Sequence, residues 1–111
     1  MKSKDRILVN KGSGNVFADL GLPHPEQEQL KAELTLQIFR IIKSRNLKQA
    51  QAGEIMGIKQ PHVSALMRNR SGNFSVGRLM EFLTALGQDV EITVKPAGRR
   101  RKHGAVSLLV E

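Results

Sequence analysis

The 111-residue sequence contains no cysteine, no tryptophan and no tyrosine, and it has no long apolar stretch. Without cysteine, a disulfide framework, a thiol nucleophile and a cysteine-ligated zinc site are excluded. The aromatic residues are four phenylalanines, of which Phe39 and Phe82 fall within apolar helical patterns, so we expect no exposed surface for stacking single-stranded DNA or RNA bases. Ile7–Val9 is too short for a signal-peptide core, and no run approaches a membrane span, which predicts a cytoplasmic protein without a membrane partner.

Groupings of catalytic residues are also scarce. The three histidines, His24, His62 and His103, lie far apart in the sequence, and none belongs to a zinc-protease spacing. The carboxylates are scattered over predicted helix faces, with no pair that could share a cleft. The sequence therefore predicts a protein that is not an enzyme and that has no cofactor and no metal site.

Positive charge is what the sequence has in excess. There are 18 lysines and arginines against 10 aspartates and glutamates, which gives a formal net charge of +8. A field of this sign attracts polyanions, and it favours nucleic acid over a membrane surface as the partner. The length is that of one small domain with arms.

The middle of the chain predicts two short helices, Gln49–Ile55 and Gln60–Arg68, joined by a turn. Gly53 is small where the second helix must approach the first, and Gly57 can take the left-handed conformation that a sharp helix exit needs. Pro61 falls in the first turn of the second helix, where its missing N–H is tolerated. The apolar residues that allow each helix to bury one face are Ala52, Met56, Ile58, Val63 and Leu66. Together these features predict a helix-turn-helix.

The same residues carry a family resemblance. The motif resembles the helix-turn-helix of the XRE (Cro-like) DNA-binding family over residues 26–87, through the spacing of Gln49, Gly53, Gly57, Ile58, Val63 and Leu66. Over residues 15–96, with NVFADLGLP before the motif and FSVGRLMEFLTALGQDVEITVKP after it, the chain resembles HigA-type antitoxins of toxin–antitoxin pairs. This resemblance implies a transcriptional repressor of its own operon that also neutralises an mRNA-cutting toxin of the RelE or HigB type. A stand-alone XRE repressor without a toxin is the alternative, and a nonspecific nucleic-acid-binding protein is a third.

The second helix of the motif is the expected recognition helix. Gln60 can pair bidentately with adenine, Lys59 or Arg68 can contact guanine or phosphate, and Ser64 discriminates poorly between bases. Lys59 stands where the family commonly has a Ser or Thr cap, which leaves the start of this helix open. The resemblance implies that Gln49 binds backbone phosphate. The residues expected to contact double-stranded DNA, rather than to be ordinary surface residues, are Gln49, Lys59, Gln60, His62, Ser64, Arg68, Asn69 and Arg70.

Helices are also predicted on both sides of the motif. Pro25 opens a long helix whose apolar residues recur every three or four positions, and Asn46 can end it. Ser75 caps a further helix, which Gly87 closes. The fold class is therefore mainly α, with four to five helices in an XRE-type helix-turn-helix domain and a dimerising β-strand at its carboxyl end.

That strand is predicted over Asp89–Lys95, where apolar and polar residues alternate until Pro96. A lone strand is not stable, so it must pair with Ile7–Val9, with Val106–Val110, or with the same strand of a second subunit. Pairing across a two-fold axis suits a homodimer on a palindromic operator. The residues expected at the dimer interface are Val90, Ile92 and Val94.

The chain divides into an N-terminal arm at 1–22, a DNA-binding domain at 23–96 with the motif at 49–68, and a basic tail at 97–111. The apolar residues of the arm either pack on the domain or contact a partner protein such as the toxin. The tail carries Arg99–Lys102, a run of four cations that is either solvated or in contact with DNA phosphates.

Overall fold

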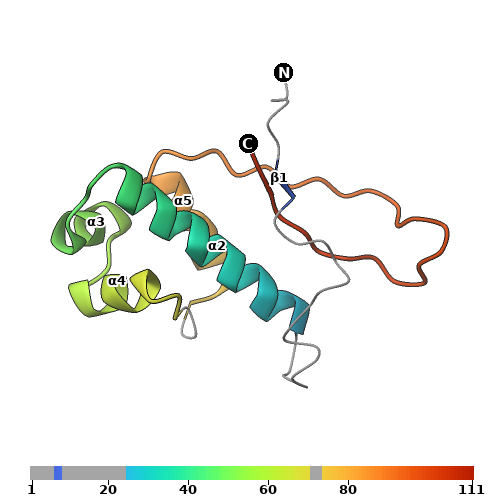
Figure 1. Ribbon diagram of the computed structural model, residues 1–111, viewed down its shortest axis with the longest axis horizontal. Coiled ribbons are helices and arrows are strands. Elements are labelled where there is room, and N and C mark those ends of the chain that lie inside the picture. Colours follow the sequence, from blue (N-terminus) through green and yellow to red (C-terminus); the bar gives the residue numbers. More distant parts are fainter. Residues whose placement is uncertain (1–6, 9–24, 71–73) are drawn as a thin grey trace.

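The computed structural model describes residues 7–8, 25–70 and 74–111 (Figure 1). These residues form a mainly helical domain. Its elements are β1 (Ile7–Leu8), α2 (Pro25–Ser44), α3 (Gln49–Met56), α4 (Gln60–Met67), α5 (Val76–Ala85) and β2 (Leu109–Val110). The apolar residues of the arm between 9 and 22 lie outside the described residues, so packing of the arm on the domain stays a prediction.

Helix α2 is the longest element and lies against both α5 and α4. Glu26 and Glu28 in its first turn and Lys43 in its last turn suit the two ends of the helix dipole. Helix α3 packs against α4 and α5, so the four helices enclose one core. The buried apolar side chains are Leu34, Ile38, Ile42, Ala52, Met56, Val63, Leu66, Leu79, Phe82, Leu83 and Leu86. The core therefore holds both helices of the motif in place.

Polar side chains are buried on one part of α2. Thr35 is fully buried, and its hydroxyl donates a hydrogen bond to the carbonyl of Lys31 at 2.7 Å. Glu33 is also buried and accepts a hydrogen bond from the side-chain amide of Gln29 at 3.0 Å. Burial raises the pKa of the Glu33 carboxyl above its usual range, and the Gln29 hydrogen bond partly opposes this shift.

Every one of the four described helices ends at a residue with a left-handed backbone. These residues are Asn46, Gly57, Asn69 and Gly87, with φ between 55° and 88°. After α4, for example, the N–H of Asn69 donates to Leu66 and the N–H of Arg70 donates to Ala65, which satisfies carbonyls that the helix leaves free. The helix ends predicted at Asn46 and Gly87 and the sharp exit predicted at Gly57 are therefore confirmed, and Asn69 adds a fourth left-handed residue.

The two strands lie at the two ends of the chain and pair with each other. Ile7 lies opposite Val110 and Leu8 lies opposite Leu109 in an antiparallel arrangement. Both segments had been candidate partners for the strand predicted over Asp89–Lys95. In the described part of the chain these two segments thus pair with each other and not with Asp89–Lys95.

No strand forms over Asp89–Lys95 in the single chain, so the predicted strand is wrong for the isolated protomer. The physical reason is that an alternating pattern becomes a strand only where it meets a ladder, and the candidate partners inside the chain pair with each other and not with this segment. Val90 packs on the core, but Ile92 is 75% exposed and Val94 is 92% exposed. Pairing of this segment with a second copy stays a prediction.

The segment from Gln88 to Leu108 leaves the helices, extends away from them and returns at β2 (Figure 1). We refer to it as the excursion. Residues 91–107 of the excursion are all exposed, and a turn at Gly98–Arg101 is closed by a 3.1 Å hydrogen bond. Among the helices of the described residues, none is both long enough and apolar enough to cross a membrane.

Candidate nucleic-acid interface

The turn between α3 and α4 is held by a close approach at Gly53. The carbonyl of Gly53 accepts hydrogen bonds from the N–H groups of Gly57 at 2.7 Å and Ile58 at 3.0 Å. A Cβ at position 53 would lie only 2.7 Å from the carbonyl oxygen of Ile58 and 3.4 Å from Cγ2 of Val63. The predicted requirement for a small residue at this point is confirmed, and the group that imposes it most strongly is the backbone of the turn.

Helix α4 begins at Gln60, with Lys59 as its N-cap in an extended conformation. Lys59 has no side-chain capping bond, because an ammonium group cannot accept one. Pro61 occupies the second helical position, which agrees with its predicted place in the first turn. Lys59 therefore lies outside the helix, and its exposed side chain is available for another contact.

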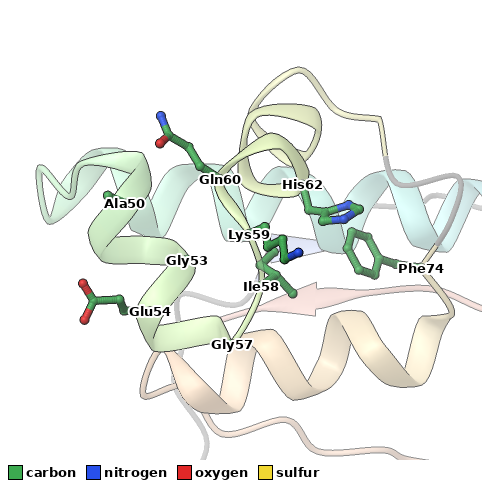
Figure 2. A pocket seen from close by; sticks show the side chains of 9 residues that line it. All are labelled: Ala50, Gly53, Glu54, Gly57, Ile58, Lys59, Gln60, His62 and Phe74. Atoms are coloured by element: carbon green, nitrogen blue, oxygen red, sulfur yellow. The ribbon is translucent and has the colours of Figure 1, made fainter.

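The exposed residues at the start of α4 line an open groove of about 780 Å³ (Figure 2). The groove brings together three residues of the predicted set, Lys59, Gln60 and His62, with a face of α3 that carries two small residues and one glutamate. Figure 2 shows Gln60 and Glu54 pointing outward from α4 and α3, while Lys59 lies between them and the His62–Phe74 pair. The groove is lined by Ala50, Gly53, Glu54, Gly57, Ile58, Lys59, Gln60, His62 and Phe74.

His62 is in contact with the beginning of α5. Its ring lies edge-on to Phe74 at a centroid distance of 5.8 Å, and Phe74 lies edge-on to the buried Phe82 at 5.0 Å. The guanidinium of Arg78 lies over the Phe82 ring, 4.7 Å from its centroid. These contacts restrict the orientation of the exposed His62 ring. Phe74 and Glu54 were not predicted at the site, and only the packing of α5 and α3 places them there.

Further along α4, Ser64 and Arg68 lie one turn apart and interact. The hydroxyl of Ser64 accepts a hydrogen bond from Nη2 of Arg68 at 3.1 Å. Ser64 is half-buried and Arg68 is exposed, whereas Val63 and Leu66 on the opposite side are buried. In this arrangement Ser64 orients the Arg68 guanidinium, so the pair presents one cationic group rather than two separate contacts.

The last two residues of the predicted set, Asn69 and Arg70, follow α4 directly. Asn69 has φ of 57°, a conformation that asparagine tolerates better than most residues. Arg70 uses its backbone N–H to close the helix, at 2.8 Å from the carbonyl of Ala65, while its side chain is exposed. The backbone of this segment is thus fixed, and the Arg70 side chain can be changed without loss of the cap.

Gln49 is the first residue of α3 and is half-buried. It is preceded by the exposed Lys48, whose backbone N–H donates to Oε1 of Gln51 at 2.8 Å. This hydrogen bond is one of the two that make up a capping box, and it satisfies a backbone N–H at the start of α3. The role of Gln51 was missed, although a glutamine three residues after a helix N-cap is a sequence signal for it.

The described residues contain no group of three His, Cys, Asp or Glu side chains that could hold a metal ion. Lys59, Gln60 and His62 share the groove beside the turn, and Ser64 and Arg68 continue along α4. Gln49, Asn69 and Arg70 lie outside the groove, at the ends of α3 and α4. The arrangement presents cationic and amide groups around one exposed helix, which is suited to contacts with phosphates and base edges.

Both a family model and a solved structure match this chain. A family model described as a helix-turn-helix domain matches residues 16–95. A solved structure named as a member of the XRE family of transcriptional regulators is 39% identical in sequence, with a TM-score of 0.76. That match covers 80% of this chain and 100% of the other chain. No curated protein matches the chain.

Proposed function

The chain belongs to the XRE family of helix-turn-helix DNA-binding transcription regulators, and from this premise we propose that it is a repressor that binds a palindromic operator as a homodimer and neutralises a toxin. The observation that carries the DNA-reading part is the exposed amino-terminal half of α4. It is anchored to the core by Val63 and Leu66 and presents Gln60 beside the groove. Helix-turn-helix proteins place such residues in the major groove.

Within this proposal the predicted residues divide into two kinds of contact. Gln60 reads a base edge, and Arg68, oriented by Ser64, contacts guanine or phosphate. Gln49, Lys59, His62, Asn69 and Arg70 contact the phosphate backbone on the two sides of α4. Phosphate contacts position the helix, and the base contacts supply the sequence preference.

Replacing Gln60 with alanine should reduce discrimination at one base pair by about 1–3 kcal/mol, because a bidentate contact to adenine is lost. Replacing Arg70 with alanine should weaken binding to all sequences alike, since its side chain contacts phosphate while its backbone keeps the cap. Both variants should be titrated against a duplex selected from random DNA and against a scrambled duplex. Equal losses on both duplexes for Gln60→Ala would remove Gln60 from the base-reading residues.

Asn69 requires a different substitution because of its backbone conformation. Asn69→Gly removes the side chain and keeps the left-handed φ, whereas alanine would also strain the end of α4. The glycine variant therefore tests a phosphate contact of the Asn69 side chain without changing the end of α4.

The antitoxin part of the proposal is supported by the resemblance to HigA-type antitoxins, which extends from NVFADLGLP to the segment after α5. The partner would be an mRNA-cutting toxin of the RelE or HigB type, and the arm at 1–22 is the part of the chain proposed to bind it. The alternative is a stand-alone XRE repressor, for which the free dimer is sufficient. The two differ in whether a toxin binds the protein at all.

Deletion of residues 1–22 should leave operator affinity nearly unchanged and lower the affinity for a co-expressed toxin by about tenfold or more, equivalent to about 1.4 kcal/mol. Because the deletion also removes β1, the matched control is Leu109→Pro, which disturbs the β1–β2 pair and leaves the arm present. The control should keep toxin binding. If the truncated protein rescues toxin-expressing cells as well as the full chain does at equal abundance, the arm is not the binding site.

A further inference from the structure

The excursion carries four consecutive cations on its turn. Arg99, Arg100, Arg101 and Lys102 account for four of the 18 lysines and arginines of the chain. The turn is formed by the hydrogen bond from the N–H of Arg101 to the carbonyl of Gly98. All four cationic residues are exposed, so their charges face solvent on a short bend of the backbone.

None of these four side chains forms an ion pair within the described residues. Ion pairs within the described residues include Lys31 with Glu28 and Arg78 with Glu81, both on helices. Adjacent like charges repel one another, and no ion pair of the described residues reduces that repulsion at these four side chains. A polyanion bound at the turn would reduce the repulsion among the four cations. Three of them are arginines, whose guanidinium groups can bind phosphate oxygens bidentately.

The position of the turn separates it from the helix-turn-helix. The excursion extends away from α3 and α4, in a molecule whose longest dimension is 47 Å (Figure 1). At roughly 3.3 Å per residue, the extended segment between Gly87 and Gly98 can span about 35 Å, close to one turn of B-DNA. The turn can therefore reach phosphates about one helical turn away from those beside α4.

The turn also lies beyond residue 95, where the match to the family model ends. It is thus an addition to the part of the chain that the family shares. A membrane surface is a poorer partner, because Leu109 and Val110 among the apolar residues that follow the cations belong to β2, whose backbone pairs with β1.

We propose that the basic turn at residues 98–102 is a second DNA-binding element, which contacts backbone phosphates flanking the operator half-site that α4 reads. This inference rests on the proposed binding of α4 to an operator. The turn supplies affinity without sequence preference, because it contacts phosphates alone. Its contribution depends on salt and on the length of DNA beyond the half-site.

The test compares two variants of the full chain. R99Q/R100Q/R101Q/K102Q removes the four charges, and R99K/R100K/R101K keeps them. Each is titrated at several salt concentrations against a duplex selected with the wild-type protein, either trimmed to the operator or extended by about 20 base pairs on each side. On the extended duplex the glutamine variant should lose about 3–4 units of the slope of log K against log salt per protomer, and the lysine variant should keep the wild-type slope. On the trimmed duplex all three proteins should behave alike.

A glutamine variant with the wild-type slope on the extended duplex would overturn the inference. An equal loss on the trimmed and extended duplexes would overturn it too, because the effect would then come from net charge and not from flanking phosphates. If the glutamine variant is unchanged on DNA but no longer binds vesicles containing phosphatidylserine, the turn is a membrane contact. If the wild-type protein selects no duplex at all, the proposed operator binding itself is wrong, which is a distinguishable result.

Discussion

In the proposed homodimer, proline at position 92 should separate the two protomers and lower operator affinity by about a hundredfold or more. A dimer that engages two half-sites gains an avidity of about 10²–10⁴ over a single half-site, and the monomer loses that gain. If Asp89–Lys95 pairs with its own copy across a two-fold axis, a proline in the middle of the ladder removes a hydrogen-bond donor. The footprint on DNA should shrink to one half-site.

The structure of the single chain makes this substitution a clean test. Ile92 is 75% exposed and lies outside every helix and strand, so proline should cost the folded protomer little. Ala105→Pro is the matched control, because Ala105 is also exposed on the excursion but lies outside the proposed strand. The control should remain dimeric and should bind the operator with wild-type affinity.

Sedimentation and DNase footprinting measure the two consequences separately. A fully dimeric Ile92→Pro protein would place the interface elsewhere on the protomer. If Ile92→Pro and Ala105→Pro both become monomeric, dimerisation depends on the excursion as a whole rather than on pairing of Asp89–Lys95.

Alanine at position 53 should destabilise the domain by about 1–3 kcal/mol and should also weaken DNA binding. The added methyl group would meet the carbonyl oxygen of Ile58 at 2.7 Å, a distance that real contacts of this kind essentially never show. Ile58 cannot move freely, because its N–H is bonded to the carbonyl of Gly53 and its side chain packs against the core. The strain therefore falls on the turn that sets the position of α4.

Gly77→Ala is the control for the general effect of replacing glycine by alanine in a helix. Gly77 lies near the start of α5 and is exposed, and its Cβ would meet only Oγ of Ser75 at 3.9 Å. Because alanine is the better helix former, this variant should be as stable as the wild type or more stable. The same glycine-to-alanine change is thus expected to lower the stability of the domain at position 53 and to keep or raise it at position 77.

Thermal unfolding gives the free-energy difference, with a shift of roughly 4–8 °C for each kcal/mol in a domain of this size. DNA affinity measured well below the transition then reports the position of α4. If Gly53→Ala has the same melting temperature as Gly77→Ala and binds the selected duplex with wild-type affinity, the α3–α4 turn tolerates the methyl group. The close approach at Gly53 then does not require glycine.

Much of the domain follows from local rules that act within a few residues. The apolar spacing of Leu34, Ile38 and Ile42 predicts the buried face of α2, and all three are buried. A left-handed exit was predicted at Gly57 and a helix end at Gly87, because helix ends depend on the conformational range of one residue, and both glycines have positive φ. The helix-turn-helix was predictable for the same reason, since each of its signals is carried by neighbours in the sequence.

The composition of the candidate interface depended on tertiary packing. Glu54 and Phe74 enter the groove because α3 and α5 lie beside α4, and their positions in the sequence contain no sign of this. Likewise, the contact of His62 with Phe74 joins two segments whose separation in space is set by the core.

The segment at Asp89–Lys95 shows most clearly what the sequence determines and what the tertiary structure determines. Its alternation by itself determined a chain with one apolar side, and Val90 does pack on the core while Ile92 and Val94 remain exposed. Whether that chain becomes a strand depends on a second backbone to supply hydrogen bonds, and the folded protomer pairs the two candidate segments, β1 and β2, with each other. Sequence alone determined the periodicity, because periodicity is local, whereas only the tertiary structure decided the pairing, because a ladder joins residues that are distant along the chain.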